Sequence, residues 1–354
     1  MTPRSIDRRS MLAGLTVGAA AVLAGCAPTA RIAATPTPTP TPTATPSATP
    51  TPTPTPSVAT GAAPLRGTQK PLTALAHPSI AVKIDNHWDA RPQWGLEHTD
   101  LVFEELVEGG LTRYVAVWHS DIPDAVGPVR SIRPMDPDII SPLGGIVAYS
   151  GGRAAFVAMM QNTPVLNRIH GISDEGLMVR STAKYAPHNV VLNASEMVAS
   201  HDDLEQPQPQ LAYALRASTA SAAAYGTPAD GVDLVFSYAS SRGWRWSEKS
   251  AAYLRTQDGV KDLDGNGERL RATNVVVLEV VIDWSYGDVP RTVLIDSGNA
   301  WVCTGGKVLQ GTWSKKSKTA PIRLRNASGV DIHLAPGNTW IELVPTSGSV
   351  KVVG

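Results

Sequence analysis

Residues 146–161 read IVAYSGGRAAFVAMMQ, and this stretch decides the fold class expected for the first half of the globular sequence. The apolar run 146–149 is typical of a buried strand, and the glycine pair that follows is a turn signal. Residues 153–161 are rich in alanine and favour a helix. The apolar runs 80–84 and 114–118 predict two further strands. We therefore expect a mixed α/β N-terminal domain, built as a layered sheet with helices.

The second half of the globular sequence is dominated by short apolar or alternating runs with turn residues between them. Such runs are typical of strands. The expected strands are 233–238, 251–255, 274–282, 292–295, 300–303 and 339–344. They predict a β-rich, antiparallel C-terminal domain, so the fold class expected for the whole chain is α+β.

The start of the chain has the three parts of a lipoprotein export signal. Basic residues precede a short apolar run, which ends in the tetrapeptide LAGC at Cys26. This tetrapeptide resembles a lipobox, so we expect residues 1–25 to be removed and Cys26 to carry the lipid. The Arg8-Arg9 pair also fits a twin-arginine export motif. The alternative is the general secretory route with two incidental arginines.

A Thr/Pro-rich segment separates the expected lipid from the globular sequence. Residues 35–56 are almost continuous Thr-Pro repeats, which favour an extended polyproline-like chain that reaches about 70 Å. We predict a linker over 26–63. The globular part is then expected to divide into an N-terminal domain (64–205), a connecting segment (206–230) and a C-terminal domain (231–354).

Charge and cysteine content limit the classes of partner. The chain has 31 basic and 31 acidic residues, and no basic stripe points to a nucleic-acid partner. The expected partner is the membrane, through the lipid on the outer face of the cytoplasmic membrane. With Cys26 lipidated, Cys303 has no partner in the chain, and its strand-like surroundings predict a buried, inert thiol.

Several sequence blocks, in order, resemble the YerB-like lipoproteins, a family labelled as a domain of unknown function, DUF3048. The blocks are 84–86 (IDN), 90–93 (ARPQ), 100–104 (DLVFE), 107–113 (VEGGLTR), 126–134 (VGPVRSIRP), 186–189 (APHN), 305–313 (GGKVLQGTW) and 336–345 (PGNTWIELVP). The resemblance implies an α+β N-terminal domain, a β-rich C-terminal domain and a surface lipoprotein role. It implies no defined biochemical activity.

These blocks carry arginines and carboxylates near predicted strand ends. Guanidinium groups form paired hydrogen bonds with carboxylate or phosphate, so the pattern predicts a site for an anionic or glycan ligand. Its expected residues are Asp85, Asn86, Arg91, Glu104, Glu108, Arg113, Arg130, Arg133, His188 and Asn189. Cell-wall polymers, lipid-linked sugar phosphates or a wall-synthesis protein are the expected partners. The alternative is that these residues form internal salt bridges that fix loops.

An enzymatic alternative is a hydrolase or transferase acting on cell-wall polymers or lipid-linked sugar phosphates. His188 could act as a base, and Ser150 precedes the glycine pair at the strand-to-helix turn. However, the sequence contains no G-x-S-x-G, H-E-x-x-H or P-loop motif. No catalytic residues are therefore assigned, and a binding role is favoured.

One acidic loop has the start of a calcium-binding pattern. Asp262, Asp264 and Asn266 supply oxygen ligands at positions 1, 3 and 5, but position 12 is Thr273 instead of a bidentate Glu. The Asp-Gly and Asn-Gly pairs of the same loop are hairpin signals. We favour the hairpin, so no cofactor is expected. Calcium or magnesium would be the ion if this loop bound one.

Overall fold

The computed structural model describes residues 58–354. The predicted export signal, the lipid at Cys26 and the Thr/Pro repeats 35–56 lie outside the described residues. Among residues 58–354, no helix is long and apolar enough to cross a membrane.

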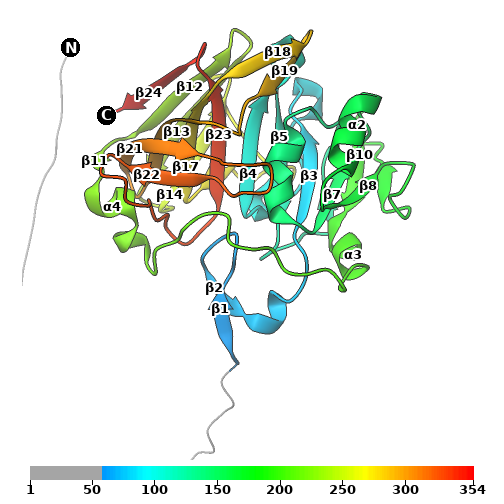
Figure 1. Ribbon diagram of the computed structural model, residues 1–354, viewed down its shortest axis with the longest axis horizontal. Helices are drawn as coiled ribbons and strands as arrows, with labels where there is room; N and C mark the ends of the chain where they lie inside the picture. The colour runs from blue at the N-terminus through cyan, green and yellow to red at the C-terminus, as the bar shows by residue number, and fades with distance from the viewer. Residues whose placement is uncertain (1–57) are drawn as a thin grey trace, which may run out of the picture. The chain divides into compact units, whose positions relative to one another are not determined.

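An 11-stranded sheet contains strands from both halves of the chain (Figure 1). In spatial order its strands are β11 (Thr227–Pro228), β21 (Lys307–Ser314), β20 (Ser297–Thr304), β17 (Asn274–Val280), β23 (Thr339–Pro345), β4 (Leu101–Leu106), β5 (Thr112–Trp118), β3 (Ile80–Asp85), β7 (Ile146–Tyr149) and β8 (Leu166–Ile169), with β22 (Arg323–Asn326) paired to β21. Strand β23 lies between β17 and β4 and is parallel to both. The expectation of an antiparallel C-terminal half was therefore wrong at β23.

A second, antiparallel sheet is built from the C-terminal half alone. Its strands are β15 (Val260–Lys261), β14 (Ala252–Gln257), β13 (Ser240–Ser247), β12 (Gly231–Ser237) and β24 (Ser349–Val353), with β16 (Arg271–Ala272) paired to β14. Trp244 of β13 packs edge-on against Trp340 of β23, with ring centroids 5.3 Å apart. Tyr114 of β5 contacts the same Trp340 at 5.4 Å. An aromatic core thus joins the two sheets.

The helices are short. They are α1 (Asp136–Ile140), α2 (Ala154–Gln161), α3 (Ala194–Ala199) and α4 (Ser221–Tyr225), with 3₁₀ turns at Leu72–Ala74, Trp88–Ala90, Leu96–His98, Glu108–Gly110, Ser141–Leu143 and Ala217–Thr219. Phe156 of α2 and Ile139 of α1 are buried in a core that also contains Val147 of β7 and Val115 of β5. Helices α1 and α2 therefore cover the face of the large sheet opposite the aromatic core, whereas α3 packs against the core that contains Trp244 and Trp340.

Three small strand groups complete the described chain. They are β1 (Thr60–Ala62) with β2 (Gln69–Pro71), β10 (Val190–Asn193) with β6 (Ala125–Val126) and β9 (Met178–Arg180), and β18 (Ile282–Tyr286) with β19 (Val289–Thr292). The predicted strand 292–295 was wrong beyond Thr292, where β19 ends. The predicted strand–turn–helix over 146–161 was confirmed as β7 and α2. The described chain is thus strand-rich with short helices.

Candidate functional site

The candidate site lies where the carboxyl ends of β3 and β7 meet the start of β5. Strands β3 and β7 are parallel, so their carboxyl ends reach the same edge, and Asp85 at the end of β3 pairs in register with Arg113 of β5. The backbone of Arg130 bridges β3 and the end of β7: its N–H donates to the Lys83 carbonyl, and its carbonyl accepts from Ser150. Ligand sites commonly form beyond the carboxyl ends of parallel strands.

We use the term arginine cluster for Arg113, Arg130, Arg133, Asp85, Glu108 and His188. At its centre, Asp85 is almost fully buried. One of its oxygens, Oδ2, lies 2.7 Å from Nδ1 of His188 and 3.1 Å from Nε of Arg130. The other, Oδ1, accepts a hydrogen bond of 3.2 Å from the backbone N–H of His87. Asp85 therefore fixes the positions of Arg130 and His188, which lie on segments remote from each other in sequence.

A second ion pair lies in the same cluster. Nε of Arg133 donates to Oε2 of Glu108 at 2.6 Å. Burial acts to raise the pKa of Glu108, but the hydrogen bond and charge of Arg133 outweigh burial and lower the pKa. The backbone N–H of Arg133 also donates to Oδ2 of Asp136 at 2.5 Å, so the start of α1 fixes the position of this arginine.

Arg113 differs from the other two arginines of the cluster, which each pair with a carboxylate. Its guanidinium donates to the Ser131 carbonyl at 2.9 Å, and within residues 58–354 it forms no ion pair. Burial and the charges of Arg133 and Arg130 together lower the pKa of Arg113 to about 10, against the opposing charge of Asp85. Three arginines thus share two carboxylates, and the cluster carries a surplus of positive charge.

A buried ion pair supports the cluster from within the sheet. Nζ of Lys83 contacts the carboxylates of Glu105 and Asp136, the latter at 2.8 Å, and all three side chains are inaccessible to solvent. Burial and the negative charge of Asp136 raise the pKa of Glu105 to about 8, against the opposing charge of Lys83. Asp136 also accepts a hydrogen bond from the backbone of Arg133. The buried ion pair between Lys83 and Asp136 therefore helps to position that arginine.

Two predicted site residues belong to a different, fully buried network between the sheets. Glu104 pairs with Arg242 at 2.6 Å and with Arg255, and these charges outweigh burial and lower the pKa of Glu104 to about 2. The Asn86 side chain bonds to Thr112, Gln93 and Gln257. Neither side chain faces solvent. The prediction that Asn86 and Glu104 bind a ligand is therefore corrected: they join the sheets.

Arg91 and Asn189 also have local partners. Arg91 lies 3.4 Å from Asp258 and lines a surface pocket of about 370 Å³ beside the β14–β15 turn, so it contacts the C-terminal half instead of Asp85. The Asn189 side chain donates to the carbonyls of Ser181 and Lys184 and accepts from Arg180. Asn189 therefore shapes the loop that carries His188. The prediction that Asn189 contacts a ligand is corrected: it positions the loop.

The predicted calcium ligands are each engaged elsewhere. Asp262 pairs with Arg255, Asp264 accepts from the backbone N–H groups of Gly95 and Leu96 at 3.1 and 2.9 Å, and Asn266 donates to Glu97. A bridge between Leu263 and Arg269 closes the loop as a hairpin. The loop is therefore the hairpin that the sequence favours, and its three polar side chains contact other groups of the protein.

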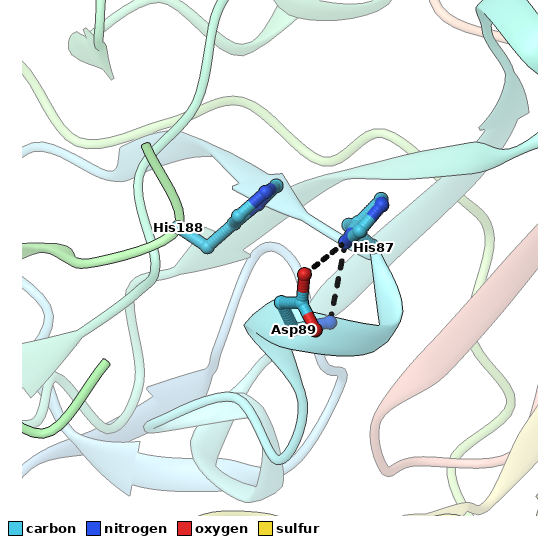
Figure 2. Close-up of side chains that lie close together, drawn as sticks. All are labelled: His87, Asp89 and His188. Carbon is cyan, nitrogen blue, oxygen red and sulfur yellow. Dashed lines mark hydrogen bonds and ion pairs between the residues drawn. The ribbon is translucent and has the colours of Figure 1, made fainter. Parts of the chain in front are cut away.

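Sequence reasoning missed a group of donors at the edge of the arginine cluster. His87, Asp89 and His188 offer ligand atoms that all lie within 4.8 Å of one another (Figure 2). The rings of His87 and His188 are stacked, with centroids 4.4 Å apart and an interplanar angle of 13°. Trp88 lies beside them and is 62% exposed. His188 is remote in sequence, so no local spacing pattern marks this group.

Two family models match the chain: "Protein of unknown function (DUF3048) N-terminal domain" at residues 65–206 and the corresponding C-terminal domain at residues 232–341. The chain is 25% identical over 303 residues to "Putative lipoprotein YerB" of Bacillus subtilis (strain 168), across 82% of this chain and 88% of that protein. The crystal structure of Bacillus subtilis YerB matches with a TM-score of 0.71 at 22% identity, over 82% of this chain and 99% of that chain.

Proposed function

The chain belongs to the DUF3048 family, and from this premise we propose that it is a membrane-anchored envelope lipoprotein whose arginine cluster binds an anionic, polyhydroxylated ligand. The relative YerB carries the description of a lipoprotein, and the lipobox-like LAGC at Cys26 supports the same anchor here. The globular part then works outside the cytoplasmic membrane. Cell-wall glycans and lipid-linked sugar phosphates are the ligand classes in that compartment.

The surplus of positive charge at Arg113 carries the proposal. This buried guanidinium has neighbouring cations and no carboxylate partner of its own within residues 58–354. Nε of Arg130 forms an ion pair with Asp85 but, among the described residues, no hydrogen bond. A bound phosphate or carboxylate would supply the missing negative charge and would accept hydrogen bonds from the exposed part of Arg130.

The accessible carboxylate of the cluster, Glu108, suits a polyhydroxylated ligand. The side chain of Glu108 is 29% exposed and that of Arg130 is 23% exposed, so each has atoms that can reach a ligand. Carboxylates accept hydrogen bonds from sugar hydroxyls, whereas guanidinium groups donate to phosphate oxygens. A sugar phosphate would use both kinds of contact at once.

Titration calorimetry with inorganic pyrophosphate and with soluble wall fragments tests the proposal on the full-length chain. We expect Arg130→Ala to weaken binding at least tenfold, and Arg245→Ala to leave it unchanged. Arg245 is a matched control because it also pairs with an aspartate, Asp233, on an exposed part of β13. Unchanged binding in both Arg113→Ala and Arg130→Ala, with a large loss of thermal stability, would assign the cluster to loop fixation.

A hydrolase or transferase is the second candidate function, because Asp85 orients the ring of His188. Their 2.7 Å contact resembles the arrangement in which a carboxylate holds an imidazole general base. The test is turnover of lipid-linked sugar phosphates by the full-length chain and by His188→Gln. Turnover that is lost in the variant, with ligand affinity retained, would favour catalysis over binding.

A further inference from the structure

We propose that His87, Asp89 and His188 form a binding site for a divalent transition-metal ion of the zinc class. Their donor atoms all lie within 4.8 Å of one another (Figure 2). Within residues 58–354, no other three histidine, cysteine or acidic side chains are close enough to hold one metal ion. Two imidazoles and a carboxylate are a common zinc ligand set that leaves a fourth position open. This site does not depend on anion binding by the arginine cluster.

The spacing of His87 and Asp89 already fits two ligands of one ion. Nδ1 of His87 lies 3.4 Å from Oδ2 of Asp89. Two donors at about 2.0–2.1 Å from a tetrahedral zinc ion lie about 3.3 Å apart. The Asp89 side chain is 62% exposed, so it can adjust without disturbing the core. When the His87 ring turns, this exposed carboxylate can follow it, so that the two residues form one edge of the coordination sphere.

Asp85 prepares His188 as the third ligand. Its Oδ2 lies 2.7 Å from Nδ1 of His188, which places the proton on Nδ1 in the neutral ring and leaves Nε2 with a free lone pair. Metal-bound histidines regularly donate their other N–H to a carboxylate in this way. Arg130, 3.1 Å from the same oxygen, holds the carboxylate in place.

The stacked rings determine how the site must close. A metal ion binds an imidazole in the ring plane, but the planes of His87 and His188 are nearly parallel, at 13°. One ring must therefore turn before both reach the same ion. We assign this motion to His87, because His188 is held by Asp85, whereas Nδ1 of His87 accepts one 3.2 Å hydrogen bond, from the Asp89 backbone. Metal binding would thus break the histidine stack.

Equilibrium dialysis and calorimetry of the full-length chain with zinc, after removal of metal by EDTA, test this site. We expect one zinc ion per chain and at least tenfold weaker binding in His87→Gln, in Asp89→Asn and in His188→Gln. His98→Gln is the matched control and should bind as wild type. His98 also has two acidic neighbours, Asp121 and Glu97, but they contact opposite nitrogens of its ring and cannot share one ion with it.

Unchanged zinc affinity in both histidine variants would overturn the proposal, as would less than one bound equivalent at about 100 μM free zinc. If a variant fails to fold, X-ray absorption at the zinc edge of the wild-type complex decides. Two imidazole nitrogens at about 2.0–2.1 Å are expected, and a spectrum without imidazole refutes the site. Pyrophosphate binding by His87→Gln, measured in parallel, should persist, so failure of one site is distinguishable from failure of the other.

Discussion

Removing the buried charge of Glu104 should destabilise the protein more than removing any single surface charge. This carboxylate is fully buried between the two sheets and is the shared partner of Arg242 and Arg255. Glu104→Gln keeps the shape of the side chain but leaves two buried guanidinium groups facing a neutral amide. Breaking a buried ion pair from one side costs about 3–5 kcal/mol.

The pKa of Glu104 gives a second measure of the same interaction. It falls from the ordinary 4.5 to about 2 because the two arginines outweigh burial. A tenfold change in acid dissociation corresponds to about 1.4 kcal/mol, so the native environment favours the ionised form by about 3 kcal/mol. Since the folded-state pKa is depressed, this stability is present above pH 4.5 and is lost as the pH falls toward 2.

Urea denaturation at pH 6 is the assay. With an m-value of about 3 kcal/mol per molar urea, a loss of 3–5 kcal/mol lowers the midpoint by about 1–1.7 M. Asp233→Asn is the control, because its pair with Arg245 is exposed and such pairs contribute about 0–1 kcal/mol. A loss below about 1 kcal/mol in Glu104→Gln would refute the reasoning that this carboxylate balances the buried arginines.

Three further predictions concern buried groups. Burial and the charge of Glu104 raise the pKa of Glu342 to about 8, so the stability contributed by its protonated form is present below pH 4.5 and is lost as the pH rises through 8. Glu342→Gln should therefore be more stable than wild type at pH 9 and within about 1 kcal/mol of it near pH 5, by urea denaturation. Asp264→Ala removes the acceptor for the N–H groups of Gly95 and Leu96 and should lower the free energy of unfolding by about 1–3 kcal/mol. Added calcium should leave the melting temperature of the wild type unchanged. A calcium-dependent rise in that temperature would support a metal site in the loop. Burial raises the pKa of Cys303 to about 12, so this thiol should resist alkylation until the protein unfolds. Mass spectrometry of the modified peptide measures the labelling. Rapid labelling of the native protein would contradict the burial of Cys303.

Local sequence signals predicted the elements whose structure depends on neighbouring residues. The 146–161 segment contains its strand, glycine turn and helix within one short window, and all three are present as β7, the turn and α2. The parallel pairing of β23 with β17 and β4 has no such signal. These strands are buried on both faces and are remote in sequence, so no alternation or turn residue specifies their neighbours.

The candidate site shows the same division. The arginine-bearing blocks predicted Asp85, Arg130 and His188, and the structure brings these three into contact. Glu104 and Glu105 are adjacent in sequence, yet side chains alternate across a strand and the two carboxylates reach different partners. Glu104 meets arginines of β13 and β14, which no local pattern around β4 reveals.

The position of β23 has a consequence for the order in which the chain matures. The N-terminal half presents β4 as an open sheet edge until Thr339–Pro345 has been synthesised, because β23 is the neighbour of β4 on that side. Strand pairing between such distant segments is slow, and an open edge favours association with other chains. The nascent chain therefore cannot complete its fold while the ribosome still holds its last strands. Protection of the unfinished edge then falls to whatever binds the chain before its last strands are released.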